Sequence, residues 1–424
     1  MRKKLWLGAG GVALFIATVY GAYLLQPRSQ VHSGSPMGLD FLAFYTAGDF
    51  VREGRSAELY DMPAVLEFQH DLARRGQVKI THEYAPWWNP PFYALVFLPF
   101  SKLSFPAALR LWTVLNLICF AAACWLLSAM LSDRRDWRSW ALIPVLMALS
   151  TPFMLAITHG QNTCTSLLLL CGVVTLWRRE EALAAGLLGG LLFYKPQLGL
   201  AVGIVLVMDL GWRAAIGYAI TGALLGSATI LLLPGTLSSF LHRLPENLHF
   251  VQTNSPYIWQ RHVTFKAFWR LLLQGPGAGE ASRMVTLLAT LGQLSIGAAL
   301  FTITLKLRRS GGLARDRLIA AAITATPLLM PFYFDYDLLL LAIPTVLFAA
   351  EYPQTGTSRL TRPILLGWAA FYVWLMINPD VAEHTRINLA VPLLTGLASL
   401  LMLRALFGND STLTTIELDC AMAP

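Results

Sequence analysis

The chain has 424 residues, of which 56% are hydrophobic and 13% are charged, and its formal net charge is +8. A soluble protein carries about twice that share of charged residues, and long apolar runs recur from end to end, which excludes a soluble domain with a single anchor. The positive charge does not indicate nucleic-acid binding, because the Lys and Arg residues fall largely at the ends of apolar runs, where they orient a protein in the membrane. The composition therefore predicts an all-α polytopic membrane protein.

The first apolar run covers residues 5–25 and follows the basic start Met1-Arg-Lys-Lys. It has the length of a full membrane span, and no small-residue cleavage motif precedes Gln26. We expect an uncleaved first helix with the N-terminus in the cytoplasm.

The first outer loop, residues 26–104, contains the first acidic residue of the chain, Asp40. A helix is predicted directly after it, because apolar and small residues recur on one face at i, i+3, i+4 and i+7. These residues are Phe41, Phe44, Tyr45 and Gly48. We expect this amphipathic helix to lie along the membrane surface.

A second surface helix is predicted after Asp61, which can cap it, with Pro63 in its first turn and Gly76 as its stop. The segment Tyr84-Ala-Pro-Trp-Trp-Asn-Pro-Pro-Phe-Tyr follows, with prolines that break a helix and rings that suit the headgroup region. The apolar piece 92–100 is too short to cross, so we expect it to be re-entrant or interfacial.

Eleven further apolar segments give a single membrane domain, residues 1–424, of about twelve spans, with a second outer loop at 234–283 and a cytoplasmic tail at 407–424. The segments are 106–131, 140–158, 163–177, 183–194, 197–208, 214–233, 284–305, 318–330, 338–350, 364–377 and 389–406. The short inner loops are rich in Arg and Lys, as the positive-inside rule requires. All eight histidines fall on the outer side, so the unusual polar chemistry gathers on one face of the membrane.

Asp40 is the strongest catalytic candidate. A carboxylate beside an aromatic helix at the membrane surface is partly desolvated, as a general base for a sugar hydroxyl requires, although a solvated loop or a helix cap explains such a residue equally simply. Asp49, nine residues further on, faces elsewhere, and we expect it to be structural.

Lys195 ends an apolar span before Pro196. It either extends to the headgroups or holds a phosphate at the membrane boundary. His159, Gln161 and Asn162 interrupt two spans, as a plain turn or as groups that bind hydroxyls or phosphate.

In the second outer loop Arg261 can hold a phosphate and His262 can contact the sugar. Asp335 and Asp337 flank Tyr336 at a span end, and one of them can face the same cavity. The sequence has no nucleotide-binding glycine loop and no zinc motif, so a sugar donor is more readily lipid-linked than nucleotide-linked, and no cofactor or metal is expected.

Cysteine is sparse, with four residues within apolar runs and one in the tail, and we expect neither a disulfide framework nor a cysteine metal site. These residues are Cys119, Cys124, Cys164, Cys171 and Cys420. The absence of loop cysteines favours a bacterial protein weakly.

The chain resembles the integral-membrane glycosyltransferases of the GT-C class, specifically glycosyltransferase family 87, which includes polyprenol-phosphate-mannose-dependent mannosyltransferases. The resemblance depends on short motifs in a common order. They are Asp40 with Phe44-Tyr45, Gly54 and Tyr60; Asn89-Pro90-Pro91-Phe92; Gly160-Gln161-Asn162; and Lys195-Pro196. One departure is that Pro331 is followed by Phe-Tyr-Phe-Asp-Tyr-Asp, where related proteins often have histidines.

The resemblance implies that Asp40 is the catalytic base and that a polyprenyl-phosphate sugar is the donor, with transfer on the outer face, inversion at the anomeric carbon and no nucleotide. We accordingly expect transfer of a hexose, mannose first, to a lipid or glycan acceptor at the periplasmic face of a bacterial plasma membrane. Lys195 and Arg261 are expected to bind the donor phosphate. The residues expected to contact substrate are Tyr45, Asn89, His159, Gln161, Asn162, His262 and Asp337.

Three other functions remain open at this point. A secondary transporter or lipid flippase usually shows repeat symmetry and charged or broken helices at mid-membrane, neither of which is clear here. A ligase or polymerase with a diphosphate-linked donor typically uses arginines in a late outer loop, and Arg261 and Arg270 fit that pattern. A membrane scaffold is the third alternative.

Overall fold

The computed structural model describes residues 38–78, 85–131, 137–254, 256–355 and 359–407, and within these ranges it consists of α-helices, 3₁₀ turns and one isolated β-bridge, with no named strand. The predicted first span, 5–25, and all but the first residue of the predicted tail lie outside the described residues. The described part confirms the all-helical prediction.

The first outer loop contains α2 (Leu39–Arg52), η1 (Ser56–Glu58) and α3 (Met62–Arg74). The prediction for α3 is confirmed: Asp61 Oδ1 accepts a hydrogen bond from the backbone N–H of Ala64 at 3.1 Å, and Gly76 ends the helix with φ +71°. Val65, Gln69 and Leu72 form its buried face, so α3 is amphipathic as expected.

The structure corrects the prediction that α2 is a surface helix, because every residue from Phe41 to Phe50 is buried. The short turns η2 (Pro91–Phe97) and η3 (Phe100–Lys102) cover the predicted apolar face of α2. The rings of Phe44 and Phe97 stack with centroids 4.8 Å apart, and a Cβ on Gly48 would lie 2.3 Å from the Phe97 carbonyl oxygen. The piece 92–100 therefore packs on α2.

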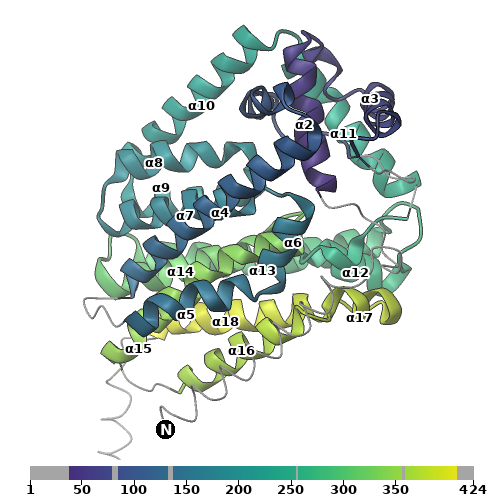
Figure 1. Ribbon diagram of the computed structural model, residues 1–424. Coiled ribbons are helices and arrows are strands. Elements are labelled where there is room, and N and C mark those ends of the chain that lie inside the picture. The colour runs from purple at the N-terminus through teal and green to yellow at the C-terminus, as the bar shows by residue number, and fades with distance from the viewer. Residues whose placement is uncertain (1–37, 79–84, 132–136, 255, 356–358, 408–424) are drawn as a thin grey trace, which may run out of the picture.

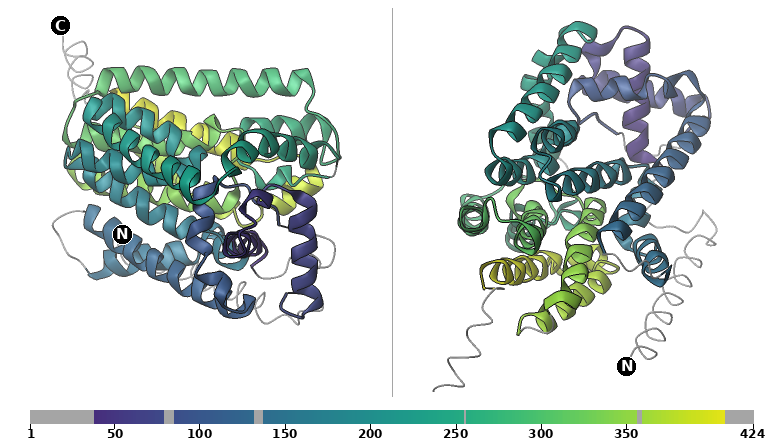
Figure 2. Two further views of the ribbon diagram at one scale, coloured as in Figure 1. Left: turned by 90° about the horizontal axis from the view of Figure 1, so that it is seen from above. Right: turned by 90° about the vertical axis from the view of Figure 1, so that its left-hand side faces the viewer.

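The other elements form the helical body seen in Figures 1 and 2, in which α13, α14 and α18 pack side by side and α16 packs on α18. They are α4 (Phe105–Met130), α5 (Trp137–Ala148), α6 (Thr151–His159), α7 (Thr163–Arg178), α8 (Ala182–Gly190), η4 (Leu191–Tyr194), α9 (Pro196–Leu210), α10 (Trp212–Leu232), α11 (Thr236–Asn254), η5 (Trp259–Arg261), α12 (Phe265–Gln274), α13 (Arg283–Leu307), α14 (Gly312–Leu329), η6 (Asp335–Leu341), α15 (Ala342–Thr355), α16 (Thr361–Trp374), α17 (Asn378–Thr385) and α18 (Ala390–Phe407).

Four helices of the described part, α4, α10, α13 and α18, are long and apolar enough to cross a membrane, or up to six spans if each of two bent pairs counts as one. The pairs are α5 with α6, bent by 63°, and α16 with α17, bent by 74°. Several other predicted spans correspond to shorter apolar helices such as α7 and α9. The chain is a membrane protein, and the twelve-span arrangement stays a prediction.

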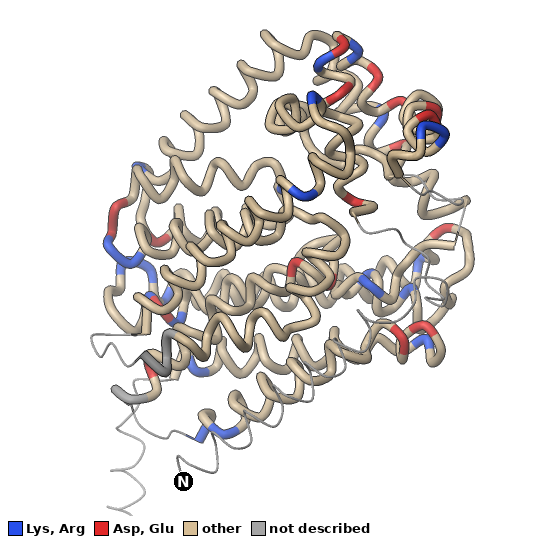
Figure 3. Tube along the Cα trace, in the orientation of Figure 1, with Lys and Arg blue, Asp and Glu red and all other residues tan. Residues whose placement is uncertain are grey.

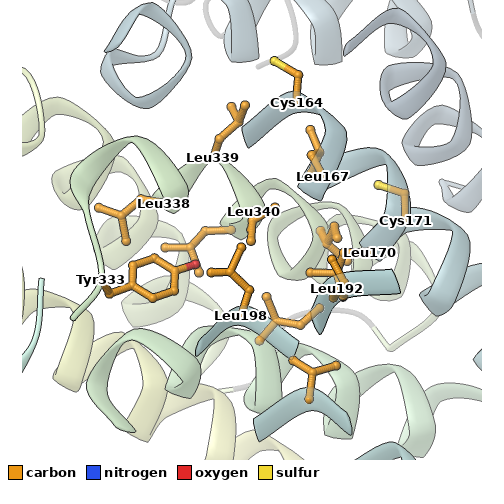
Figure 4. Packing of buried hydrophobic residues seen from close by; sticks show 14 of the residues in the cluster. Cys164, Leu167, Leu170, Cys171, Leu192, Leu198, Tyr333, Leu338, Leu339 and Leu340 are labelled. Carbon is orange, nitrogen blue, oxygen red and sulfur yellow. The ribbon is translucent and has the colours of Figure 1, made fainter. Parts of the chain in front are cut away.

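The core lies where α7, η4, α9 and η6 meet (Figure 4). The central helix α14 is buried over residues 315–328. The predicted span 318–330 is thus extended at its start, and Arg315 and Arg317, expected in an inner loop, lie within the protein. Arg315 Nε contacts Asp209 Oδ2 at 2.8 Å, and an Arg317 guanidinium nitrogen contacts Glu351 Oε1 at 2.7 Å. Pairing of this kind makes buried charge tolerable.

Charged residues gather mostly toward opposite ends of the helical body, whereas the middles of the long helices are largely uncharged (Figure 3). This pattern is typical of a protein whose helices cross an apolar layer. The candidate site described below belongs to the end formed by the outer loops.

The tightest helix pair is α8 with α10, where glycines bring the two backbones together. A Cβ on Gly186 would lie 2.1 Å from the Ala214 carbonyl oxygen, and one on Gly217 would lie 2.4 Å from the Leu183 carbonyl oxygen. Small residues at such positions are what allow close helix packing in a membrane, where apolar burial provides no driving force.

We expect Gly186→Ala to lower the stability of the purified protein by about 1–3 kcal/mol, because the added methyl group meets backbone that has no room to move. Gly226→Ala is the matched control, since the same methyl group on α10 has no neighbour within 4 Å. Thermal unfolding of both variants in one detergent, followed by intrinsic fluorescence, measures the difference. Equal melting temperatures for the two variants would contradict the close packing of α8 and α10.

Candidate functional site

Two glycines join the first outer loop to the helical body and place Asp40. Gly38 and Gly160 both have left-handed backbones, with φ +81° and +70°, and the Gly38 N–H donates to the Thr158 carbonyl at 2.8 Å. A Cβ on Gly160 would lie 2.7 Å from the Cβ of Phe41 and 3.4 Å from the Cα of Gly38. Only glycine fits at position 160, because the backbone there is left-handed and a Cβ would collide with Phe41.

This contact brings Asp40 beside Gln161. The Gln161 Nε2 group donates to Asp40 Oδ2 at 2.9 Å and to the Tyr336 hydroxyl at 3.1 Å, which links residues 121 and 175 positions apart in the chain. Asp40 is partly exposed, and within the described part of the chain no side chain or backbone group is bonded to its second oxygen, Oδ1. One oxygen is therefore fixed and the other is open to a ligand.

The second element of the site is the buried pair Lys195–Asp337. Lys195 Nζ lies 2.8 Å from Asp337 Oδ1 and 3.0 Å from Oδ2, and both side chains are less than a tenth exposed. The Thr163 hydroxyl donates to Asp337 Oδ1 at 2.8 Å. Lys195 therefore does not extend to the lipid headgroups, since it is held inside the protein between α9 and η6.

The third element is Arg261, which forms a two-point contact with Asp335 through Nε at 3.0 Å and a second guanidinium nitrogen at 2.8 Å. Its remaining terminal nitrogen lies 3.0 Å from His159 Nε2. His159 Nδ1 lies 2.9 Å from the Leu155 carbonyl, which only accepts, so Nδ1 carries the proton and Nε2 accepts from Arg261.

Tyr336 connects the three elements. Lys195 Nζ lies 5.3 Å and the Arg261 guanidinium carbon 5.8 Å from the centre of its ring, which stacks on Phe334 with centroids 5.0 Å apart. Cations at these distances are attracted to the ring. The two cations are each paired with one aspartate, so Asp40 is the site carboxylate that has no cation partner among the described residues.

The structure brings six of the predicted site residues into this network: Asp40, His159, Gln161, Lys195, Arg261 and Asp337. Asn162 is next to it but fully buried; its Nδ2 donates to the Tyr93 hydroxyl at 3.0 Å, and its Oδ1 has no partner in the described chain.

The other three predicted residues lie outside this network. Tyr45 donates its hydroxyl proton to the Leu103 carbonyl at 2.8 Å within the aromatic core of α2. The Asn89 carbonyl accepts from the Tyr60 hydroxyl at 2.6 Å. His262 has no exposed surface and packs its ring on Phe334 with centroids 4.0 Å apart.

Asp49, predicted to be structural, is buried and paired with Arg52 on its own helix. Arg270, whose place in the late outer loop fitted a ligase, instead donates to the backbone carbonyls of Gly275 and Gly277 at 2.8 and 2.9 Å. Both residues therefore support local structure.

Sequence reasoning missed Thr163 and Tyr336 as members of the network, and it expected only one of Asp335 and Asp337 to face the site. The run Phe332-Tyr-Phe-Asp-Tyr-Asp carried the signal for Tyr336 and for both aspartates, because two acids and four aromatic rings stand together at a span end. Within the described ranges no group of three His, Cys, Asp or Glu side chains is placed to hold a metal ion.

Comparison with known proteins gives one match. Residues 87–331, more than half of the chain, match the family model described as glycosyltransferase family 87. Neither the curated proteins nor the solved structures contain a significant match.

His262 provides a test of the geometry around Arg261. Burial, followed by the nearby charges of Arg261 and Lys266, lowers the pKa of His262 from 6.5 to about 3. The unfolded chain therefore binds a proton on this histidine below pH 6.5, whereas the folded protein does not bind it until about pH 3. The contribution of His262 to stability is thus complete above pH 6.5. As the pH falls below 6.5, the free energy of unfolding decreases by about 1.4 kcal/mol per pH unit.

We expect His262→Gln to lose less stability than wild type between pH 7 and pH 5. The control is His249→Gln, which removes an exposed histidine of the same outer loop and should behave as wild type. Melting temperatures at the two pH values give the comparison, and equal losses for all three proteins would contradict the burial of His262.

Proposed function

The chain belongs to glycosyltransferase family 87 and is a membrane enzyme that transfers a sugar, and from that premise we propose that it takes a hexose, mannose first, from a polyprenyl-phosphate donor. The acceptor is a hydroxyl of a lipid or glycan. Asp40 is the general base, and the reaction takes place at the outer face of a bacterial plasma membrane. Family membership removes the support for a transporter or a scaffold.

The observation that supports Asp40 most directly is its hydrogen bonding. A general base needs an oxygen that can reach the proton it removes, together with a fixed orientation. Gln161 fixes Oδ2 of Asp40, Oδ1 has no bonded group among the described residues, and the side chain is partly exposed. Asp335 and Asp337 are less suited to the task, because each is neutralised by a cation at 3.0 Å or less.

In the proposed reaction the acceptor oxygen attacks the anomeric carbon from the face opposite the phosphate, and its proton passes to Asp40. The bond between the anomeric carbon and the phosphate oxygen breaks with its electron pair on the oxygen, so polyprenyl phosphate leaves and the configuration inverts. Negative charge grows on the phosphate, which is where cationic groups lower the barrier most.

Lys195 and Arg261 are the cations that we assign to this phosphate. An ammonium has three donor hydrogens and a guanidinium five, so each cation keeps a donor after its contacts with Asp337, or with Asp335 and His159. Both also lie against the Tyr336 ring, so the two cations are next to the same side chain.

The donor lipid must approach from the bilayer, and α10 offers an apolar exterior for it. Leu224, Ile230 and Leu231 are among the exposed apolar side chains of that helix, and η2 packs against it beside the Pro90-Pro91 segment. We propose that these elements line the entry of the polyprenyl chain.

We expect Asp40→Asn to reduce sugar transfer by a factor of about 10²–10⁴, because the amide keeps an oxygen for Gln161 but cannot take a proton. Asp49→Asn is the matched control, since it changes a buried aspartate of the same helix that is paired with Arg52. The assay measures transfer from a radiolabelled polyprenyl-phosphate hexose to a lipid-extract acceptor pool by purified protein. Full activity of a folded Asp40→Asn protein would remove Asp40 as the base.

We expect Arg261→Lys to weaken binding of the polyprenyl-phosphate hexose about tenfold, because lysine keeps the charge but cannot bond Asp335 at two points and His159 at once. Arg243→Lys is the control, since Arg243 is an outer-loop arginine whose pair with Asp61 is largely exposed. Equilibrium binding of the radiolabelled donor measures the difference. Unchanged affinity in Arg261→Lys would place the phosphate elsewhere.

A further inference from the structure

A pocket of about 220 Å³ lies in the second outer loop, apart from the network around Asp40. Three segments form it: α11, the stretch from η5 to the start of α12, and the residues just before α13. Its lining residues are His249, Gln252, Thr253, Trp259, Lys266, Gly279, Glu280 and Ala281. Since one water takes about 30 Å³ of the liquid, the space corresponds to roughly seven waters, or to one sugar ring.

The floor of the pocket combines an indole with polar groups. Trp259 is 2% exposed and Gln252 is 8% exposed, and both line the pocket. In the described part of the chain Trp259 Nε1 and Gln252 Nε2 are buried without a hydrogen-bond acceptor. Unpaired buried donors cost free energy, so two of them beside an open space favour a ligand that carries acceptor oxygens.

The charges around the pocket favour a neutral polar ligand over a phosphate. Lys266 is the only lysine or arginine among the described lining residues, and its ammonium donates to Gln252 Oε1 at 3.3 Å and lies 5.6 Å from the centre of the Trp259 ring. Arg270 also lies 5.9 Å from that ring, but its guanidinium is bonded to backbone carbonyls of the same loop. Burial lowers the pKa of Lys266, which weakens it further as a site for an anion. Glu280 stands at the rim, where it repels negative charge.

The mouth of the pocket is formed by exposed polar side chains. His249 and Glu280 have side chains that are 66% and 77% exposed, whereas the floor is buried. A donor with a polyprenyl chain must enter from the bilayer, so a pocket that opens among exposed polar side chains suits the other substrate. An aromatic ring with hydrogen-bonding neighbours is a common way to bind the apolar face and the hydroxyls of a sugar.

The pocket also adjoins the catalytic network through a single turn. Trp259 and Arg261 are the two ends of η5, and the Asn388 side chain donates to the carbonyls of Gln260 and His262 at 3.3 and 3.0 Å, which fixes this turn. One end of η5 thus belongs to the pocket and the other to the site of the donor phosphate.

We propose that this pocket binds a sugar residue of a glycan acceptor while the lipid donor occupies the site around Asp40. The inference rests on the proposed function for the role of acceptor, but sugar binding in the pocket does not depend on the identity of the donor.

Saturation-transfer NMR on the full-length protein in detergent tests it, with methyl α-D-mannopyranoside, methyl α-D-glucopyranoside and methyl α-D-galactopyranoside as probes. Ala281→Phe fills the pocket, and Ala278→Phe adds the same ring at an exposed position of the same loop that does not line it. We expect at least one probe to bind wild type, Ala278→Phe and Asp40→Asn alike, and to bind Ala281→Phe at least tenfold more weakly. Gln252→Leu should weaken binding in the same direction, which guards against a local misfold of Ala281→Phe.

Failure of all three probes to bind wild type, or equal binding to Ala281→Phe and Ala278→Phe, would overturn the proposal. Binding of radiolabelled polyprenyl-phosphate hexose by the same samples separates the two claims. Loss of donor binding in Ala281→Phe would assign the pocket to the donor and overturn the acceptor role. Probe binding by a wild-type protein that neither binds nor uses this donor would contradict the proposed donor and support the pocket.

Discussion

The arrangement of the site depends on the backbone of η6. In a 3₁₀ turn successive side chains point about 120° apart, because three residues complete one turn. Asp335, Tyr336 and Asp337 are successive residues at the start of η6, and each reaches a different partner: Arg261, Gln161 and Lys195. An α-helical start would separate successive side chains by about 100° and Asp335 from Asp337 by about 160°, whereas the 3₁₀ turn spreads all three evenly around its axis. One short segment thereby holds three distant parts of the chain.

The ion pairs held by η6 affect both the folding of the protein and the affinity of the site for an anion. A buried pair contributes little net stability, yet removal of one partner costs about 3–5 kcal/mol because the other charge remains in an apolar setting. Lys195 and Arg261 are therefore neutralised before any substrate arrives. In the proposed reaction a phosphate would add to contacts that already exist, which would limit its affinity and favour release of the lipid phosphate after transfer.

Much of the helical architecture follows from apolar length alone. The predicted segments 106–131 and 163–177 agree with α4 and α7 to within a residue at each end, because polar or helix-breaking residues stand at their boundaries. The burial of α2 did not follow, since its apolar stripe predicts an apolar partner but cannot distinguish the η2 turn that covers it from the lipid of the membrane. The site residues were recognised as polar exceptions, but their pairing was not, because partners such as Gln161 and Tyr336 are 175 positions apart. Tyr336 itself was hidden by its place in an aromatic run, where a ring is expected to pack and its hydroxyl is easily overlooked.

The glycines at positions 38 and 160 explain why the first outer loop belongs to the candidate site at all. The match to the glycosyltransferase family covers residues 87–331, so Asp40 lies before it and Tyr336 after it. Gln161 is within the matched region and donates to both of these residues, and its position follows from the backbone contact of Gly160 with Gly38 and Phe41. The Trp112 indole donates to the Gly160 carbonyl at 2.8 Å and stacks near Phe41, so α4 holds the same junction from the other side. Asp40, the proposed base, thereby acquires the rigidity of the helical body, which a proton-transfer group needs in order to meet its substrate in one orientation.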